Sequence, residues 1–233
     1  MNNKDIVKWF VIGDFFKKEY DENPCINLSI YKKNDVLLAV KKAYVDMTPR
    51  NIGGLKEAHD NNKEQFENSL NSVFGTLADR FIGYFDTMPN TEKQFDNWHK
   101  KTCRDFKKDF QNFLNSQKVG YTIQYGKAQK IVNMTFKYLY CFDDAEDEYF
   151  KYCHMALDQY TLKWYNEEYD QNYRKSKEYL SSDYNYRASS GWSNLNETKY
   201  QNIQDLIRII LDGKSPFFEE FIIWMKYKKK ANT

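Results

Sequence analysis

Apolar residues recur along most of this chain at the three- and four-residue spacing of helices that bury one face. Residues 92–114 are the clearest case, because aromatic side chains line one face there and lysines and aspartates fill the other. Only 9 glycines and 4 prolines interrupt the 233 residues, which favours long helices over a many-turned β fold. The sequence therefore predicts an all-α, single-domain multi-helix bundle over residues 1–233. The same spacing predicts further helices at 4–20, 63–88 (with a break at Gly75 or Gly83 left open), 127–142, 158–168, 199–211 and 216–228, and a short buried helix after Asn34-Asp35.

Three segments interrupt the helical pattern. Residues 48–62 contain Pro49, Gly53 and Gly54 and are predicted to be a loop. Residues 120–125 are short and aromatic, which is typical of either one short strand or an extended linker. Residues 169–197 are polar and rich in tyrosine and serine, so we expect a long loop of the kind that is functional or mobile.

The composition narrows the classes of function. With a formal net charge of +2 the chain has no overall attraction for nucleic acid, so any such binding must come from a local patch. The 4 cysteines are widely spaced, which favours reduced structural thiols over a zinc or disulfide framework. The EF-hand, Walker and H-E-x-x-H motifs are missing from the sequence, so we expect no metal and no cofactor. No apolar run approaches about 18 residues and the N-terminus lacks a signal-peptide pattern, which predicts a cytoplasmic protein without a membrane partner.

The strongest candidate for chemistry is a pair of predicted helices near the middle of the chain. Gly126 opens the first helix, Lys127 and Lys130 stand in its first turn, and Lys137 lies on the same face. A neutral lysine amine is a nucleophile, and crowding by like charges at a helix N-terminus favours loss of its proton. Asp158 opens the second helix, where a carboxylate can stabilise a developing cation. The alternatives are a solvent-exposed basic face for the lysines and simple helix capping for Asp158.

This arrangement resembles the helix-hairpin-helix DNA glycosylase superfamily, most nearly its 8-oxoguanine branch. In that family a glycine-containing turn opens a helix that bears the catalytic lysine, and an apolar-apolar-Asp segment opens a following helix with the catalytic aspartate. Gly126-Lys127-Ala128-Gln129-Lys130 is similar to the first element, and Met155-Ala156-Leu157-Asp158 is similar to the second. The resemblance covers a small part of the chain. It implies that Lys127 or Lys130 attacks the anomeric carbon of the sugar while Asp158 stabilises the oxocarbenium ion.

Other residues are candidates for contact with nucleic acid. Arg174 and Arg187 are interleaved with tyrosines in the long polar loop, a composition that suits base stacking and phosphate pairing and suits protein recognition equally well. His154 is a candidate for shaping a pocket or binding a phosphate, with a buried core histidine as the alternative. Together with Gly126 and Lys137, these residues are our predicted nucleic-acid contacts.

Three functional hypotheses follow from these patterns. The first is a base-processing enzyme of DNA N-glycosylase type that acts on DNA or a nucleotide. The second is a non-catalytic relative whose helices bind nucleic acid or nucleotide. The third is a helical interaction protein, for example a phage or anti-phage defence factor, that binds another protein through the tyrosine-rich loop. Only the first hypothesis needs a lysine amine and the Asp158 carboxylate to converge on one pocket.

Overall fold

The computed structural model describes residues 28–173 and 191–231 of the chain. Within these ranges the chain forms helices and no β-strand, which confirms the predicted all-α class. The α-helices are α3 (Lys33–Asp46), α4 (Leu55–Asn61), α5 (Lys63–Thr87), α6 (Glu92–Ser116), α7 (Tyr125–Leu139), α8 (Gln159–Glu168), α9 (Glu197–Leu211) and α10 (Pro216–Ala231). The short helical turns are η1 (Pro49–Asn51), η2 (Asp147–Phe150), η3 (Tyr169–Tyr173) and η5 (Trp192–Asn194). The helix predicted at residues 4–20 lies outside the described residues.

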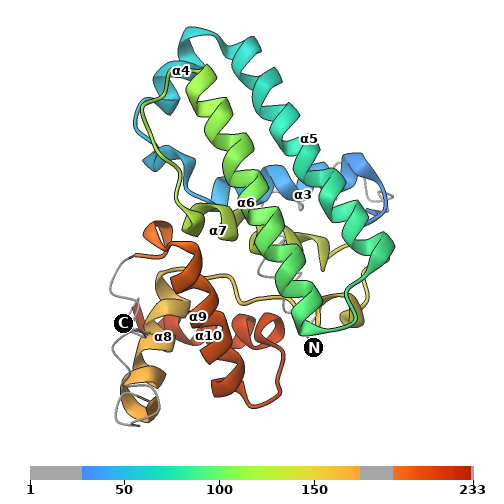
Figure 1. Ribbon diagram of the computed structural model, residues 1–233, viewed down its shortest axis with the longest axis vertical. Helices are drawn as coiled ribbons and strands as arrows, with labels where there is room; N and C mark the ends of the chain where they lie inside the picture. The colour runs from blue at the N-terminus through green and yellow to red at the C-terminus, as the bar shows by residue number, and fades with distance from the viewer. Residues whose placement is uncertain (1–27, 174–190, 232–233) are drawn as a thin grey trace.

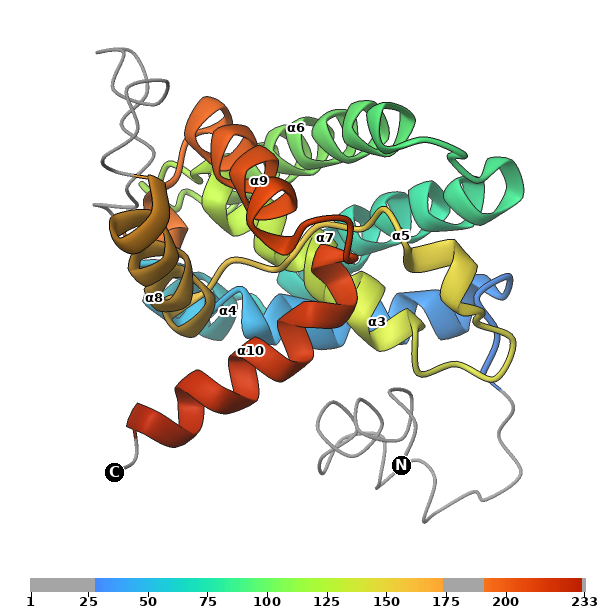
Figure 2. The ribbon, with the colours of Figure 1, turned by 90° about the horizontal axis from the view of Figure 1, so that it is seen from below.

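Helix α7 is the centre of the fold. The long helices α5 and α6 lie side by side at one end of the molecule, and α8, α9 and α10 gather at the other (Figure 1). Between these two groups α7 packs against α3, α6, α9 and η5 (Figure 2). The buried apolar side chains join in one hydrophobic core, which includes edge-to-face aromatic contacts such as Phe81 on Phe136.

Every residue of α7 except Met134 is buried, including the three lysines at positions 127, 130 and 137. The interpretation of these lysines as a solvent-exposed basic face is therefore wrong. Burying an ammonium group is costly unless it is paired or hydrogen-bonded. The lysines consequently mark the places where this central helix meets polar groups of its neighbours.

The loop predicted at residues 48–62 contains helical structure. The turn η1 and the short helix α4 both lie within it. Gly54 adopts a φ of 81° immediately before α4, a left-handed conformation that glycine reaches without steric cost. Helix α5, by contrast, runs unbroken through Gly75 and Gly83.

Residues 119–124 connect α6 to α7 without forming a strand. Gln111 of α6 holds this segment, because its Nε2 donates to the carbonyl of Tyr121 at 3.0 Å and its Oε1 accepts the amide of Ile123 at 3.0 Å. One side chain thereby occupies backbone groups that a neighbouring strand would need. Of the two alternatives that the sequence leaves open, the segment is an extended linker.

The polar segment 169–197 is only partly a loop. It begins with the π-helical turn η3, which continues α8, and it ends with η5 and the first residue of α9. Arg174 and Arg187, two of the predicted nucleic-acid contacts, lie outside the described residues.

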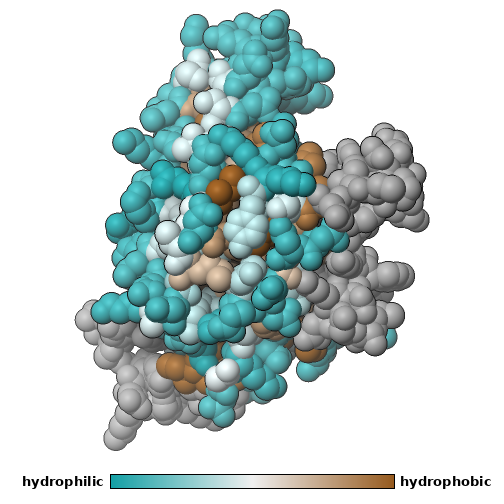
Figure 3. Space-filling view, turned by 90° about the vertical axis from the view of Figure 1, so that its right-hand side faces the viewer, coloured by the Kyte–Doolittle hydropathy of each residue, from teal (hydrophilic) through white to brown (hydrophobic). Residues whose placement is uncertain are grey.

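The surface in Figure 3 is mostly hydrophilic, with apolar side chains at scattered positions. The large apolar side chains that are exposed come from separate elements: Tyr31, Val45, Ile209 and Ile222. In the described parts of the chain, no helix is both long enough and apolar enough to cross a membrane.

Candidate active site

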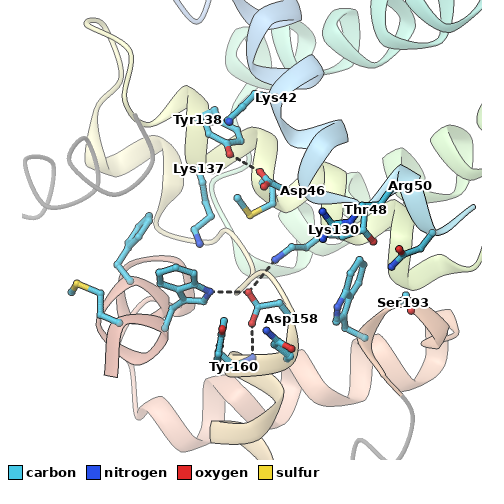
Figure 4. A pocket seen from close by; sticks show the side chains of 17 residues that line it. Lys42, Asp46, Thr48, Arg50, Lys130, Lys137, Tyr138, Asp158, Tyr160 and Ser193 are labelled. Atoms are coloured by element: carbon cyan, nitrogen blue, oxygen red, sulfur yellow. Dashed lines mark hydrogen bonds and ion pairs between the residues drawn. The ribbon is translucent and has the colours of Figure 1, made fainter. Parts of the chain in front are cut away.

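A cavity of about 610 Å³ lies where α7, α10 and the start of α8 meet the turns η1 and η5 (Figure 4). This volume falls in the range of small-molecule sites in proteins. Of the predicted site residues, Lys130, Lys137 and Asp158 line the cavity. The full lining combines aromatic side chains with cations and two carboxylates: Lys42, Asp46, Thr48, Arg50, Asn51, Lys130, Met134, Lys137, Tyr138, Asp158, Gln159, Tyr160, Trp192, Ser193, Phe221, Trp224 and Met225.

Lys130 and Asp158 converge in this cavity. Nζ of Lys130 lies 3.3 Å from Oδ2 of Asp158, and Nε1 of Trp224 donates to the same oxygen at 3.0 Å. The Lys130 and Asp158 side chains are 7% and 15% exposed, so the pair is largely withdrawn from water while it borders the cavity. A lysine amine and a carboxylate from two different helices therefore share one pocket.

Asp158 is also the cap of helix α8. Its Oδ1 accepts the amides of Tyr160 at 2.8 Å and Thr161 at 3.0 Å, and its own amide donates to the Thr161 hydroxyl at 2.8 Å. These bonds form a capping box. Burial raises the pKa of the Asp158 carboxyl, but the charge of Lys130 and the capping amides outweigh burial and hold the pKa below its usual value. The carboxylate is thus ionised at neutral pH, with one oxygen bound to the helix and the other to the lysine.

Lys127 points away from this pair. Its Nζ donates to the carbonyl oxygens of Met47 at 3.0 Å and Thr48 at 3.3 Å, on the turn that follows α3. Thr48 adopts a φ of 56° in this turn, and the buried ammonium fastens the turn to α7. Burial lowers the pKa of Lys127. Lys127 is outside the cavity lining, so Lys130 is the lysine placed to act on a ligand.

Lys137 forms a second buried ion pair at the cavity wall. Its Nζ lies 2.5 Å from Oε1 of Glu220 on α10, and Oε2 of the same carboxylate accepts the amide of Ala156 at 2.7 Å. Burial raises the pKa of Glu220, whose side chain is fully enclosed, while Lys137 opposes this rise. Through Glu220, this ion pair helps to hold the segment that leads into Asp158.

Two glutamines, one on α7 and one on α9, also hold the backbone of the segment that leads into Asp158. Gln129 of α7 donates from Nε2 to the carbonyl of Leu157 at 3.2 Å, and its Oε1 accepts the amide of Leu157 at 3.4 Å. Gln204 of α9 donates to the carbonyl of Met155 at 2.7 Å. Both glutamines are fully buried. The position of Asp158 is therefore set jointly by α7, α9 and α10.

His154 lies in the core, 1% exposed, and is outside the cavity lining. Its ring nitrogens lie 3.0 Å from the Tyr200 hydroxyl and 2.8 Å from Oδ1 of Asp96, and Arg208 donates to both oxygens of that carboxylate. Burial lowers the pKa of His154 to about 4 despite the opposing effect of Asp96, so the ring is neutral at pH 7. This placement favours the core alternative over contact with a ligand.

Gly126 allows η5 to approach α7 closely. A Cβ atom at this position would lie 1.9 Å from the carbonyl oxygen of Trp192, which leaves no room for any side chain. The approach places the Trp192 ring centroid 5.9 Å from Nζ of Lys130 and 5.6 Å from Nζ of Lys127. Gly126 thus shapes the cavity wall by packing, and the structure gives it no direct place in the lining.

Sequence reasoning missed four residues that build the site: Gln129, Trp192, Glu220 and Trp224. Glu220 carried a partial signal, because it and Glu219 are the only charged residues between Phe217 and Trp224, and a charge that faces the core needs a buried partner. Gln129 carried a weaker one, as a polar side chain on a helix with apolar residues on several sides. The contribution of Trp192 depends on the close approach of η5, which the pattern of residues does not reveal.

Comparison with protein-family models, with curated proteins and with solved structures finds no match for this chain. The described residues also contain no group of three or more His, Cys, Asp or Glu side chains that could hold a metal ion. The chemistry of the site therefore has to be derived from the cavity and its own side chains.

Proposed function

We propose that this protein is a DNA N-glycosylase with lyase activity, in which Lys130 is the nucleophile and Asp158 is its charged partner. The observation that carries the proposal is the 3.3 Å approach of Nζ of Lys130 to Oδ2 of Asp158 at the wall of the cavity. Displacement of a base by an amine needs a nucleophilic lysine and a carboxylate in one pocket. The resemblance of residues 126–130 and 155–158 to glycosylases supports the same reaction.

Lys130 and Asp158 can supply and accept every proton that the proposed reaction moves. The Lys130 ammonium gives a proton to Oδ2 of Asp158, which passes it to the base as the N-glycosidic bond breaks and the bonding electrons leave with the base. The carboxylate of Asp158, ionised again, stabilises the oxocarbenium ion. Nζ then bonds to C1′ of the sugar. As the C1′–O4′ bond breaks, O4′ takes a proton from the nitrogen and a protonated imine remains.

The aromatic lining suits a nucleobase. An enzyme that acts on a base must take it out of the stack and hold it between planar groups. Trp192, Tyr160, Phe221 and Trp224 supply such groups around the Lys130–Asp158 pair. Stacking on aromatic side chains is worth about 1–3 kcal/mol for each base. This energy offsets part of the cost of taking the base out of the duplex.

Borohydride trapping tests the proposal, because borohydride reduces the imine to a stable amine that links protein and DNA. The probes are labelled duplexes that each carry one damaged base, one modified base or an abasic site. We expect a covalent adduct with the wild-type protein, no adduct with Lys130→Gln, and an adduct with Lys127→Gln. Peptide mapping of the wild-type adduct should place the sugar on Lys130, which keeps the test decisive if Lys127→Gln does not fold.

A non-catalytic role is the alternative, and the same ion pair bears on it. A buried Lys130–Asp158 pair that serves only to join α7 to α8 would have the same geometry. In that case the wild-type protein forms no adduct with any duplex, and Lys130→Gln lowers the free energy of unfolding without changing a reaction. That outcome would replace the enzyme by a non-catalytic helical protein that binds nucleic acid or another protein.

A further inference from the structure

Two exposed cations stand on different elements, one in the lining of the cavity and one against a residue of that lining. Arg50 stands on η1 and belongs to the cavity lining. Lys228 stands on α10 with its Nζ 4.4 Å from the ring centroid of Trp224, which lines the cavity as well. Among residues 28–173 and 191–231, neither cation lies within salt-bridge distance of a carboxylate. Both charges are therefore available to a ligand that reaches the mouth.

Two lysines in the lining of the cavity differ from these exposed cations, because they are already neutralised. Lys130 is paired with Asp158, and Lys137 is paired with Glu220. Both lysines are also buried, whereas Arg50 and Lys228 are exposed. An anion that approaches from solvent consequently meets Arg50 and Lys228 before it meets either internal pair.

We propose that Arg50 and Lys228 form a phosphate-binding rim that holds the backbone of a nucleic-acid strand while one of its nucleotides enters the cavity. This inference rests on the proposed function, because it takes the occupant of the cavity to be a nucleotide of that strand. The guanidinium of Arg50 matches the geometry of phosphate oxygens, and Lys228 acts as a point charge. The contact with the face of Trp224 keeps the Lys228 ammonium beside the cavity wall.

A free nucleoside monophosphate offers the same phosphate chemistry, but a strand fits the arrangement better. The two cations stand on separate elements, η1 and α10, and the proposed reaction releases a base from a strand, in which each nucleotide is flanked by phosphates. Successive phosphates of a strand that crosses the mouth can meet both cations at once. Backbone contacts of this kind position the strand and carry no sequence information, which leaves selection of the base to the cavity.

The salt dependence of binding tests the rim. The probe is a fluorescein-labelled duplex of about 15 base pairs with a central tetrahydrofuran abasic analogue, and anisotropy gives the binding constant between about 50 and 200 mM salt. Each phosphate contact contributes about 0.9 to the slope of log K against log salt concentration. We expect Arg50→Gln and Lys228→Gln each to reduce the slope by about 1, and the double variant by about 2. Lys63→Gln, which removes one exposed charge at the start of α5, is the matched control and should keep the wild-type slope.

Three results would overturn the rim. The first is an unchanged slope for both rim variants, and the second is wild-type protein that does not bind the duplex at about 50 mM salt. The third is an equal loss of slope in Lys63→Gln, which would attribute the effect to overall charge. If deoxyadenosine monophosphate displaces the duplex as effectively as an unlabelled strand does, the rim binds free nucleotides. That result would contradict the proposal that its ligand is a nucleic-acid strand.

The rim and the proposed catalysis can fail separately. Lys130→Gln should lose the borohydride adduct and keep the wild-type salt slope, because it is buried behind the rim. Reduced slopes in the rim variants without any wild-type adduct would retain the rim and contradict the glycosylase. A wild-type adduct with unchanged slopes would retain the glycosylase and contradict the rim.

Discussion

Asp158 shares its carboxylate between its own helix and Lys130. Oδ1 caps α8 through the amides of Tyr160 and Thr161, while Oδ2 lies 3.3 Å from Nζ of Lys130. Helix capping and the contact with Lys130 are thus carried by different atoms of one side chain. The two alternatives that the sequence left open for Asp158 are compatible, and substitutions can separate them.

Asp158→Asn should preserve the cap and remove the charge. Asparagine is as good an N-cap residue as aspartate, so we expect the helix to stay intact. The oxocarbenium ion would lack its countercharge, and the rate of adduct formation should fall on the order of 100-fold or more. Single-turnover trapping measures the rate, and anisotropy should show unchanged binding of the duplex.

Asp158→Ala is the matched control for the cap. It removes both functions, so its free energy of unfolding should be about 1 kcal/mol lower than that of Asp158→Asn. Urea unfolding of the two variants gives this difference. If the asparagine variant is as unstable as the alanine variant, the carboxylate acts chiefly as a structural partner of Lys130.

Gln129→Met should impair the reaction by releasing the backbone beside Asp158. The substitution keeps the volume and leaves the amide and carbonyl of Leu157 unpaired, which costs about 1–3 kcal/mol for each buried group. We expect slower adduct formation together with a lower free energy of unfolding. The salt slope of duplex binding should not change, because the rim is untouched.

Gln111→Met is the control for that loss of stability. Gln111 makes the same kind of two-bond contact, with the carbonyl of Tyr121 and the amide of Ile123, away from the cavity. Its replacement should lower stability, by less than Gln129→Met because Gln111 and Tyr121 are only half-buried, and leave the rate of adduct formation near wild type. Equal losses of rate in both variants would show that Gln129 acts only through overall stability.

Gly126→Ala should be severely destabilising. The new Cβ would lie 1.9 Å from the carbonyl oxygen of Trp192, so η5 or α7 must move. Overpacking of this kind costs typically about 1–3 kcal/mol, and contact with a backbone atom places the change at the upper end.

Gly75→Ala in α5 is the opposite case, since nothing lies within 4 Å of its Cβ position. Alanine there should raise the free energy of unfolding by roughly 0.5–1 kcal/mol.

Acid should destabilise the protein through His154. Burial lowers its pKa to about 4 in the folded protein, whereas the ring titrates at about 6.5 in the unfolded chain. Between these values the unfolded chain binds more protons, so the free energy of unfolding falls as the pH drops from about 6.5 towards 4. The stabilisation is fully present above this window, and its loss amounts to roughly 3 kcal/mol. Urea unfolding at a series of pH values measures it.

Two histidine variants locate the source of that dependence. His154→Gln should flatten the curve in part, because burial lowers the pKa of His99 as well and this second ring acts in the same window. His99→Gln should likewise flatten the curve in part, because it removes the other buried ring. A wild-type stability that stays constant from pH 6.5 to 4 would contradict a neutral, buried His154.

Apolar spacing was enough to predict most of the helices, because each of them buries one face. Helices α5 and α6 begin where predicted and end within two residues of the predicted positions. The segment 48–62 failed, since α4 contributes only one buried residue, Leu55, to the core. A helix so short leaves too few apolar positions for a period to be recognised.

The candidate site was predictable only in part. A lysine after a glycine turn and an aspartate at a helix start pointed to Lys130 and Asp158, and the sequence could not choose between Lys127 and Lys130. That choice depends on which neighbour each lysine meets, and Thr48, which holds Lys127, lies 79 residues away in the chain. The contacts of Trp192, Trp224 and Gln129 likewise join residues that are far apart in the sequence. Local spacing does not contain them.

Helix α10 completes the surroundings of Asp158. Glu220 holds Ala156 from 64 residues further along the chain, and Trp224 donates to Asp158 from 66 residues further along. During synthesis, Lys130 and Asp158 therefore emerge from the ribosome well before α10. Until α10 has emerged and packed, Asp158 and the segment before it lack the contacts with Trp224 and Glu220. These surroundings of Asp158 are therefore complete only after α10 has been synthesised.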